Sequence, residues 1–355
     1  MIREKIACFP EIGDYYIVVN LLLERCLNYK TIICPPTTRR TVEIGSRNSP
    51  DMICTPFKVT LGNLIEALEA GANVLVMPGA GCRLGFYDLL QKQILSDLGY
   101  EFEMLPLFDY IPSAERLFKN FKEINPDLTQ DNFNKIFALV IRVTKDMDSL
   151  NDFLRKNMAF EMAKGECRRQ YQAYLKKIQN ASDLDEAETL GKKYRELLQT
   201  VEINKPDNPI RIGIIGEMYD VMEPFANCEL EKWLTDHGVE IDCTVNLTNI
   251  ATALFTVPEQ IAKSGGYATY NIGSTANDSL ARAYEMVNNG IDGIIHIKPA
   301  SCSPETTLMM ILQNLSRDYQ TPILYLTFDT ETSEAGLHTR LEAFHDMIVM
   351  KGSRQ

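Results

Sequence analysis

The sequence lacks the features that would mark a membrane, secreted or nucleic-acid-binding protein. No apolar run approaches the roughly 18 residues that a membrane-spanning helix needs, and the first six residues carry three charges where a signal peptide would have an apolar core. Positive charge is scarce, because 36 Lys and Arg residues stand against 48 Asp and Glu, a formal net charge of -12. The sequence therefore predicts a cytoplasmic protein that binds neither nucleic acid nor membrane.

Several catalytic motifs are missing as well. The chain has only four histidines, scattered along the sequence, so from the sequence we expect no histidine-based metal centre. It contains no Gly-x-Ser-x-Gly nucleophile elbow and no Walker sequence, so ATP hydrolysis would require a separate partner. The apolar run 210–215 ends at Gly216 but lacks the third glycine of a dinucleotide-binding loop.

Short apolar runs alternate with helical stretches in both halves of the chain. Each run is closed by Pro, Gly or a polar cluster, which is typical of strands in a parallel sheet with helices on both faces. The sequence therefore predicts an α/β fold with two Rossmann-like, doubly wound parallel sheets. The predicted strands are 5–8, 31–34, 51–54 and 73–77, then 210–215, 240–245, 293–297 and 323–327.

The segment between the two halves has a different composition. From about residue 110 to 200 its only glycines are Gly165 and Gly191, and Lys, Glu, Gln, Leu and Tyr are frequent. Such a composition favours helix, and apolar residues such as Phe133, Phe137 and Ile141 suggest amphipathic packing. We predict an N-terminal α/β domain over 1–110, a helical insertion over 111–205 and a C-terminal α/β domain over 206–355.

Nine cysteines are present, an odd number that argues against a disulfide framework in a cytoplasmic protein. Five of them follow predicted strands, where loops of a parallel sheet bind ligands: Cys8, Cys34, Cys54, Cys82 and Cys302. Spacing alone matches no compact zinc or ferredoxin motif. Buried apolar cysteines, a catalytic thiol and metal ligands all remain open on this evidence.

Cys54, Cys82 and Cys302 lie between a strand and the start of a helix in locally unusual segments. A helix N-terminus favours the thiolate, the form that binds metals. The glycines around Cys82 would let backbone amides approach a bulky cofactor, while Arg83 and Lys58 could supply positive charge beside it.

Five segments occur in an order that resembles the 2-hydroxyacyl-CoA dehydratase component D family, also called the benzoyl-CoA reductase subunit family. The likeness is to its activase-related branch, whose relatives include double-cubane cluster proteins. It covers both sheet regions, about two thirds of the chain, but not the helical segment. The segments are 54–62, 81–87, 216–219, 292–305 and 339–344.

The resemblance implies an iron-sulfur cluster held by Cys54, Cys82 and Cys302 between two Rossmann-like domains. This would be a 4Fe-4S cluster, or a double-cubane cluster shared between two chains. Three ligands leave one iron open, and in the family an ATP-dependent activator protein supplies low-potential electrons. A homodimer or a related second subunit is also implied.

The function expected from the resemblance is reduction, or radical dehydration, of a small substrate such as a 2-hydroxyacyl-CoA. An alternative is a non-catalytic accessory or electron-relay partner of a larger acyl-CoA dehydratase activase. Zinc held by the three cysteines and a water is a third possibility. No motif identifies a CoA site, and catalytic residues stay unassigned.

Overall fold

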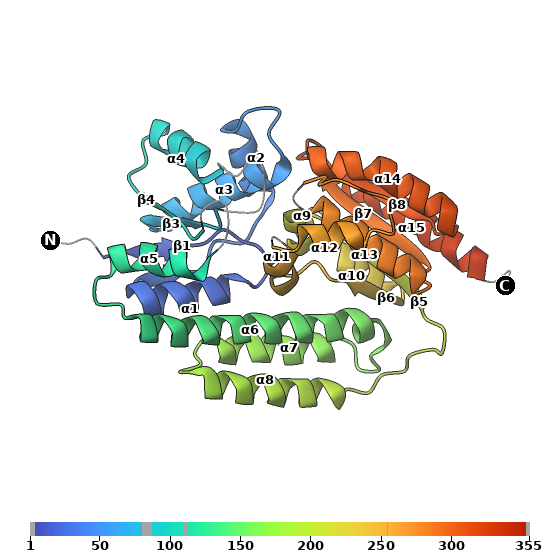
Figure 1. Cartoon of the computed structure of the whole chain (residues 1–355), viewed down its shortest axis with the longest axis horizontal. Coiled ribbons are helices and arrows are strands. Elements are labelled where there is room, and N and C mark those ends of the chain that lie inside the picture. Colours follow the sequence, from blue (N-terminus) through green and yellow to red (C-terminus); the bar gives the residue numbers. More distant parts are fainter. Residues whose placement is uncertain (1–3, 80–86, 109–112, 254, 274, 353–355) are drawn as a thin grey trace. The chain divides into compact units, whose positions relative to one another are not determined.

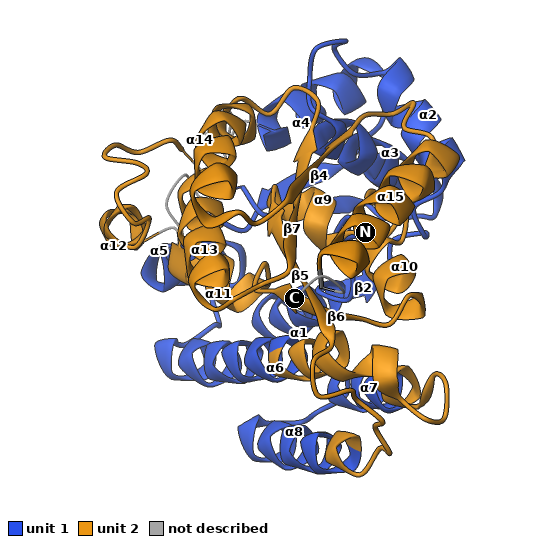
Figure 2. Cartoon of the chain, turned by 90° about the vertical axis from the view of Figure 1, so that its right-hand side faces the viewer, with its two compact units in different colours: residues 1–148, 170–197 blue, residues 149–169, 198–355 orange. Residues whose placement is uncertain are grey.

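The computed structural model describes residues 4–79, 87–108, 113–253, 255–273 and 275–352. The chain divides into two compact units, shown in Figure 2: residues 1–148 and 170–197 form unit 1, and residues 149–169 and 198–355 form unit 2. The predicted domain boundary at residue 110 falls within unit 1, and the one at residue 205 falls within unit 2. The division into three domains stays a prediction. Every helix in the described ranges is too short or too polar to cross a membrane.

Unit 1 is built on a parallel sheet with the strand order β2-β1-β3-β4. Its strands are β1 (Ile6–Cys8), β2 (Lys30–Ile32), β3 (Val74–Met77) and β4 (Glu103–Pro106). Helices in this half of the chain are α1 (Tyr16–Leu27), α2 (Arg39–Arg47), α3 (Thr55–Glu69), α4 (Tyr87–Asp97) and α5 (Ala114–Ile124). The core on one face packs Leu75 and Met77 of the central strand against Phe57, Leu61 and Leu64 of α3.

Unit 2 repeats this architecture with the strand order β6-β5-β7-β8, again entirely parallel. Its strands are β5 (Ile210–Gly216), β6 (Val239–Cys243), β7 (Gly293–Pro299) and β8 (Ile323–Phe328). Its helices after β5 are α9 (Met218–Met222), α10 (Leu230–Asp236), α11 (Leu247–Ala253), α12 (Val257–Ala262), α13 (Ala276–Asn288), α14 (Ser303–Tyr319) and α15 (Glu334–Gly352). The predicted fold class, two parallel α/β sheets, is confirmed (Figure 1).

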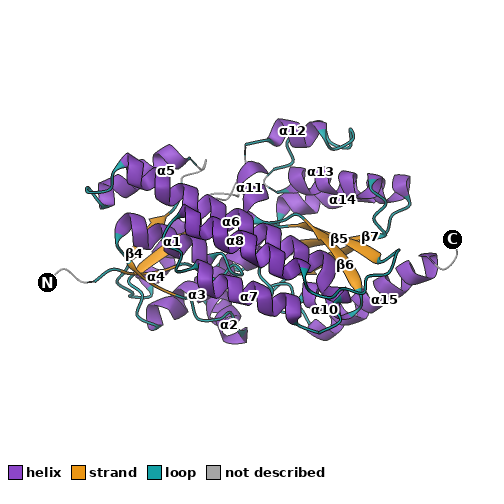
Figure 3. Ribbon diagram, turned by 90° about the horizontal axis from the view of Figure 1, so that it is seen from below, coloured by secondary structure: helices purple, strands orange, loops and turns teal. Residues whose placement is uncertain are grey.

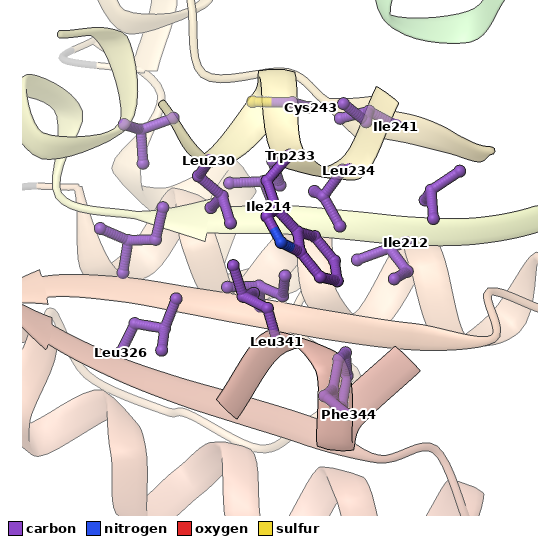
Figure 4. Packing of buried hydrophobic residues seen from close by; sticks show 14 of the residues in the cluster. Ile212, Ile214, Leu230, Trp233, Leu234, Ile241, Cys243, Leu326, Leu341 and Phe344 are labelled. Carbon is purple, nitrogen blue, oxygen red and sulfur yellow. The ribbon is translucent and has the colours of Figure 1, made fainter. Parts of the chain in front are cut away.

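The central strands of unit 2 carry apolar side chains on both faces of the sheet, and helices pack against each face. Ile212 and Ile214 of β5 face a core that α10 and α15 complete with Trp233, Leu341 and Phe344 (Figure 4). On the opposite face, residues of α13 and α14 such as Leu280 and Leu312 pack against the sheet. Continuous apolar strands of this kind are typical of doubly wound parallel sheets.

The segment between the two sheets is helical, as predicted. After α5 it contains α6 (Gln130–Asn157), α7 (Glu166–Ile178) and α8 (Leu184–Gln199). Helix α6 is continuous over its 28 residues, as Figure 3 shows. Its buried positions include Phe133, Leu139, Val143 and Met147, whereas Ile141 is exposed, so the predicted apolar stripe was wrong at that position.

The prediction of a strand at 51–54 is wrong. Residues 50–53 form a turn in which the amide of Ile53 donates to the carbonyl oxygen of Pro50, and α3 begins directly afterwards at Thr55. Pro50 closes the preceding helical region, and only two apolar residues, Met52 and Ile53, precede Cys54. This run is too short to distinguish a strand from a turn.

Candidate functional site

In both sheets the chain reverses its direction of winding at one pair of central strands. In unit 1 these are β1 and β3, and in unit 2 they are β5 and β7. The loops leaving such a pair run in opposite directions, and ligands of open α/β sheets bind in the crevice that results. β3 is followed by Pro78 and Gly79, and Cys82 and Arg83, a few residues further along the chain, lie outside the described residues. The loop after β7 ends at Cys302.

Cys54 is the N-cap residue of α3, with extended backbone geometry (φ -68°, ψ 157°) and Pro56 in the first helical turn. Proline is favoured there because its fixed φ suits a helix and its missing N–H loses no internal bond. The thiol of Cys54 is half-buried and hydrogen-bonds with the hydroxyl of Tyr87 at the start of α4. The Tyr87 ring also makes an edge contact with Phe57, with 5.0 Å between centroids.

Helix α3 is placed by a very close contact with α2. A Cβ atom added to Gly62 of α3 would lie 2.0 Å from the carbonyl oxygen of Thr41, and one added to Gly45 of α2 would lie 1.8 Å from that of Lys58. Only glycine permits this approach at either position. The contact fixes the start of α3 and, with it, the thiol of Cys54.

Lys58, predicted to supply positive charge, lies one turn into α3 and is half-buried. Its ammonium donates to the carbonyl oxygen of Asp51 at 3.1 Å, in the turn that leads to Cys54. Lys58 therefore stabilises the loop before the cysteine and keeps a positive charge in the first turn of the helix.

Cys302 occupies the equivalent position in unit 2. It is the N-cap of α14 (φ -75°, ψ 107°), with Pro304 in the first turn, and its carbonyl oxygen accepts from the amide of Thr306 at 3.0 Å. Like Cys54, it is half-buried and its side chain makes no capping hydrogen bond to the helix.

The residues behind Cys302 form a buried, hydrogen-bonded framework. Glu305, in the first turn of α14, is fully buried and accepts from Thr275 and pairs with His296 Nε2, each at 2.8 Å. Lys298 is 5% exposed and its ammonium donates to the carbonyl oxygens of Pro299 and Ala300 at 3.3 Å. These bonds tie the loop before Cys302 and the first turn of α14 to β7 and to the start of α13.

The electrostatics of this framework centre on a buried lysine near Cys302. Burial lowers the pKa of Lys298, while its interactions with Cys302, Glu305 and Asp220 oppose that shift. Negative charge around Lys298 therefore favours its charged form.

Two more carboxyl groups stand at the end of β5. Glu217 caps α9 by accepting from the amide of Asp220 at 3.0 Å; burial, aided by the charge of Glu305, raises its pKa to about 7. Asp220 is fully buried, and burial followed by the charge of Glu217 raises its pKa well above the ordinary value. Gly216, at φ +138°, lets this strand end approach Ile297 of β7, whose carbonyl oxygen would lie 1.9 Å from an added Cβ.

The remaining described cysteines have a different environment. Cys8, Cys26, Cys34, Cys167 and Cys243 are buried, while Cys228 is half-buried in the loop before α10. Burial raises the pKa of Cys26 and Cys167 to about 12 and that of Cys243 to about 11. A hydrogen bond with the Cys8 thiol, together with burial, raises the pKa of Cys34. The raised pKa of Cys26, Cys34, Cys167 and Cys243 disfavours the thiolate, which is the form that binds a metal.

Cys54 belongs to unit 1 and Cys302 to unit 2. Across the described residues, no three His, Cys, Asp or Glu side chains are gathered to hold a metal ion. At each of the two positions a half-buried thiol stands at the N-terminus of a long helix, which favours an anionic group.

A comparison with protein-family models finds no match to this chain, and a comparison with curated proteins finds no significant relative. The resemblance based on the motifs in the sequence therefore stands as a prediction.

Sequence reasoning assigned no role to Tyr87, Lys298 or Asp220. For Lys298 the sequence does hold a sign. A lysine that directly follows the apolar run 294–297 continues a buried strand, so its side chain is expected to be buried too. Tyr87 and Asp220 cannot be recognised from the sequence. Tyr87 contacts Cys54, which is distant in the chain, and the environment of Asp220 depends on its complete burial.

Proposed function

We propose that the chain is an iron-sulfur redox protein in which Cys54, Cys82 and Cys302 hold a 4Fe-4S cluster, or a double-cubane cluster shared between two chains. The observation that supports this best is the contrast among the cysteines. Of the eight that the structure describes, only Cys54 and Cys302 are both half-buried and the N-cap of a long helix. Helix N-termini stabilise anionic groups, and a protein-bound 4Fe-4S cluster with thiolate ligands is anionic.

The surroundings of both cysteines suit this role. The Tyr87 hydroxyl can donate to the sulfur of Cys54, and the Lys298 ammonium lies within electrostatic reach of Cys302. Hydrogen bonds to cluster sulfurs and nearby positive charge are the means by which proteins raise a cluster's reduction potential. A cluster held by three cysteines would keep one iron open to a substrate oxygen, a water or a bridging sulfide.

In this proposal a separate ATP-dependent activator reduces the cluster, because the chain has no Walker sequence of its own. The reduced protein acts in reduction or radical dehydration of a small substrate such as a 2-hydroxyacyl-CoA, in the cytoplasm, as a homodimer or with a related second subunit. A second candidate is an accessory electron relay that turns over no substrate. It is favoured by the lack of a recognisable CoA-binding motif.

The test is iron and sulfide content with EPR spectroscopy on protein purified without oxygen. We expect about four iron and four sulfide per chain, with loss of most of both in Cys54→Ser and in Cys302→Ser. Cys228→Ser is the matched control, because this cysteine is also half-buried but is not the N-cap of a helix. Full iron content in the Cys54 and Cys302 variants, or zinc in place of iron, would overturn the proposal.

Turnover separates the two candidates once the cluster is present. The purified protein is mixed with an activator, ATP and a reductant, and 2-hydroxyacyl-CoA thioesters are tested for dehydration. Product formation favours the enzyme, and cluster reduction without product favours the relay.

A further inference from the structure

A second group of possible metal ligands lies on unit 2, on the face of the sheet covered by α10 and α15. His237 ends α10 and is exposed, and His345 lies on α15 and is half-buried. Both rings contact Trp233, which packs into the core shown in Figure 4. Neither histidine takes part in the site proposed for the cluster.

The protonation pattern of His237 is that of a ligand. Its Nδ1 lies 2.7 Å from the carbonyl oxygen of Trp233. Because a carbonyl oxygen only accepts, Nδ1 carries the proton, and Nε2 of the neutral ring has a free lone pair. Metal-binding histidines commonly use their second nitrogen in this way, since the hydrogen bond fixes the tautomer and the ring. The ring is also stacked on Trp233, with 3.7 Å between centroids and 16° between planes.

His345 presents a complementary feature. Its Nε2 is buried and has no hydrogen-bond partner among the described residues. A buried polar atom without a partner loses the hydrogen bond it would make to water, so it calls for an explanation such as a bound ion. Its Nδ1 lies 3.9 Å from a carboxylate oxygen of Asp346, too far for a hydrogen bond.

The spacing of the two rings suits one shared ion. A transition metal bound at about 2.0 to 2.1 Å from a ring nitrogen lies about 3.2 Å from the ring centroid. Two imidazoles on one ion therefore have centroids about 5 to 6.5 Å apart for ligand angles between tetrahedral and linear. The centroids of His237 and His345 are 6.1 Å apart, with 66° between their planes.

We propose that His237 and His345 together bind one divalent transition-metal ion through their Nε2 atoms. No third His, Cys, Asp or Glu in the described residues completes the set, so water on the open side of the exposed His237 ring supplies the remaining ligands. A site with two imidazoles and water selects ions that favour nitrogen ligands, Ni²⁺ and Cu²⁺ above Mn²⁺ or Mg²⁺. The ion contacts the ring stacked on Trp233, so that residue reports on binding.

The experiment uses Ni²⁺ with the full-length, tag-free protein and follows tryptophan fluorescence. Trp233 is the only tryptophan in the chain, so the signal comes from this site alone. We expect saturable quenching by Ni²⁺, and equilibrium dialysis should show one fewer bound ion in His237→Gln and in His345→Gln than in the wild type. In both variants the apparent Kd for quenching should rise at least about tenfold, because loss of a ligand costs at least as much as loss of a group that supports one.

His338→Gln is the matched control, because His338 lies on the same helix and faces Glu334 at 3.9 Å. It should bind Ni²⁺ as the wild type does. Because His237 is exposed, its replacement leaves the core intact, and circular dichroism checks that both variants fold. Quenching that is unchanged in either variant, or equally weakened in His338→Gln, would overturn the proposal whatever the outcome for the iron-sulfur cluster.

Discussion

At the residue scale, the carboxyl group of Asp220 has the most demanding environment in the candidate site. It is fully buried, and neither of its oxygens has a hydrogen-bond partner in the described part of the chain. The charge of Lys298 offsets part of the cost of burying it, but the charge of Glu217 adds to that cost. Buried carboxyl groups avoid such a cost by keeping their proton.

Asp220 should therefore make the protein less stable as the pH rises. Its native pKa is raised, so above the unfolded value of about 3.9 the folded state holds a proton that the unfolded chain releases. The free energy of unfolding then falls by up to about 1.4 kcal/mol per pH unit until the native pKa is reached. In Asp220→Asn the free energy of unfolding should not fall in this way. Urea denaturation followed by Trp233 fluorescence should therefore show the stability of the variant, relative to the wild type, increasing from about pH 5 to pH 8.

Asp236→Asn, an exposed change on α10, is the control. Its free energy of unfolding should change with pH in the same way as that of the wild type. Glu217, whose pKa is raised to about 7, adds a loss of the same sign. Because Glu217 and Asp220 interact, the comparison reports the combined effect of the two groups and not their simple sum. If Asp220→Asn follows the wild type at every pH, Asp220 is ionised in the folded protein.

The positions of Cys54 and Cys302 could be predicted from the sequence because the signal is local. Pro56 and Pro304 each follow two residues after a cysteine, which marks the first turn of a helix. The framework behind Cys302 could not be predicted in the same way. It joins Thr275, His296 and Glu305 from three elements, and only the folded sheet brings them together.

At the scale of elements, the contact between α2 and α3 is very close at both of its glycines, Gly45 and Gly62. Gly62→Ala would place a methyl group 2.0 Å from a backbone oxygen of Thr41, and backbone cannot move aside as a side chain can. We expect the free energy of unfolding of unit 1 to fall by about 1 to 3 kcal/mol, as is usual for overpacking. Chemical denaturation followed by circular dichroism measures this change.

Gly336→Ala is the matched substitution at a helical glycine with space around it. The nearest atom to its added Cβ, in Ser333, is 3.9 Å away. It should be neutral or stabilising by up to about 1 kcal/mol, because alanine favours helix and restricts the unfolded chain. Equal destabilisation by both changes would mean that the loss at Gly62 does not come from the contact with Thr41, because alanine by itself favours helix.

Most elements could be predicted from apolar periodicity, and those that were missed have little of it. Strand β4 lies at the edge of its sheet with exposed or half-buried residues, so it lacks the continuous apolar run of a central strand. Helix α2 has only two aliphatic residues, Val42 and Ile44, among arginines and small residues. Its position depends on the two glycines of its contact with α3, which no periodic pattern reveals.

At the scale of the whole molecule, the two units have separate sheets and separate cores, so they need not unfold together. Trp233 lies in unit 2, and its fluorescence reports on that unit, whereas circular dichroism reports on both. We expect the two probes to give different denaturation midpoints. In Gly62→Ala only the circular dichroism curve should shift. Coincident curves that shift together would show that the chain unfolds as one cooperative unit.

The division of the chain has a consequence for how the protein forms during synthesis. The chain passes between the units after residues 148, 169 and 197, and these points lie inside α6, α7 and α8. Unit 1 therefore cannot be completed until residue 197 has left the ribosome, although its sheet ends at residue 106. The piece of unit 2 at 149–169 emerges before any strand of that unit and must wait for it. Each unit consists of two separate stretches of sequence, so truncating the chain at a single point cannot yield either unit alone. Expressing one unit by itself would require its two stretches to be joined by a new linker.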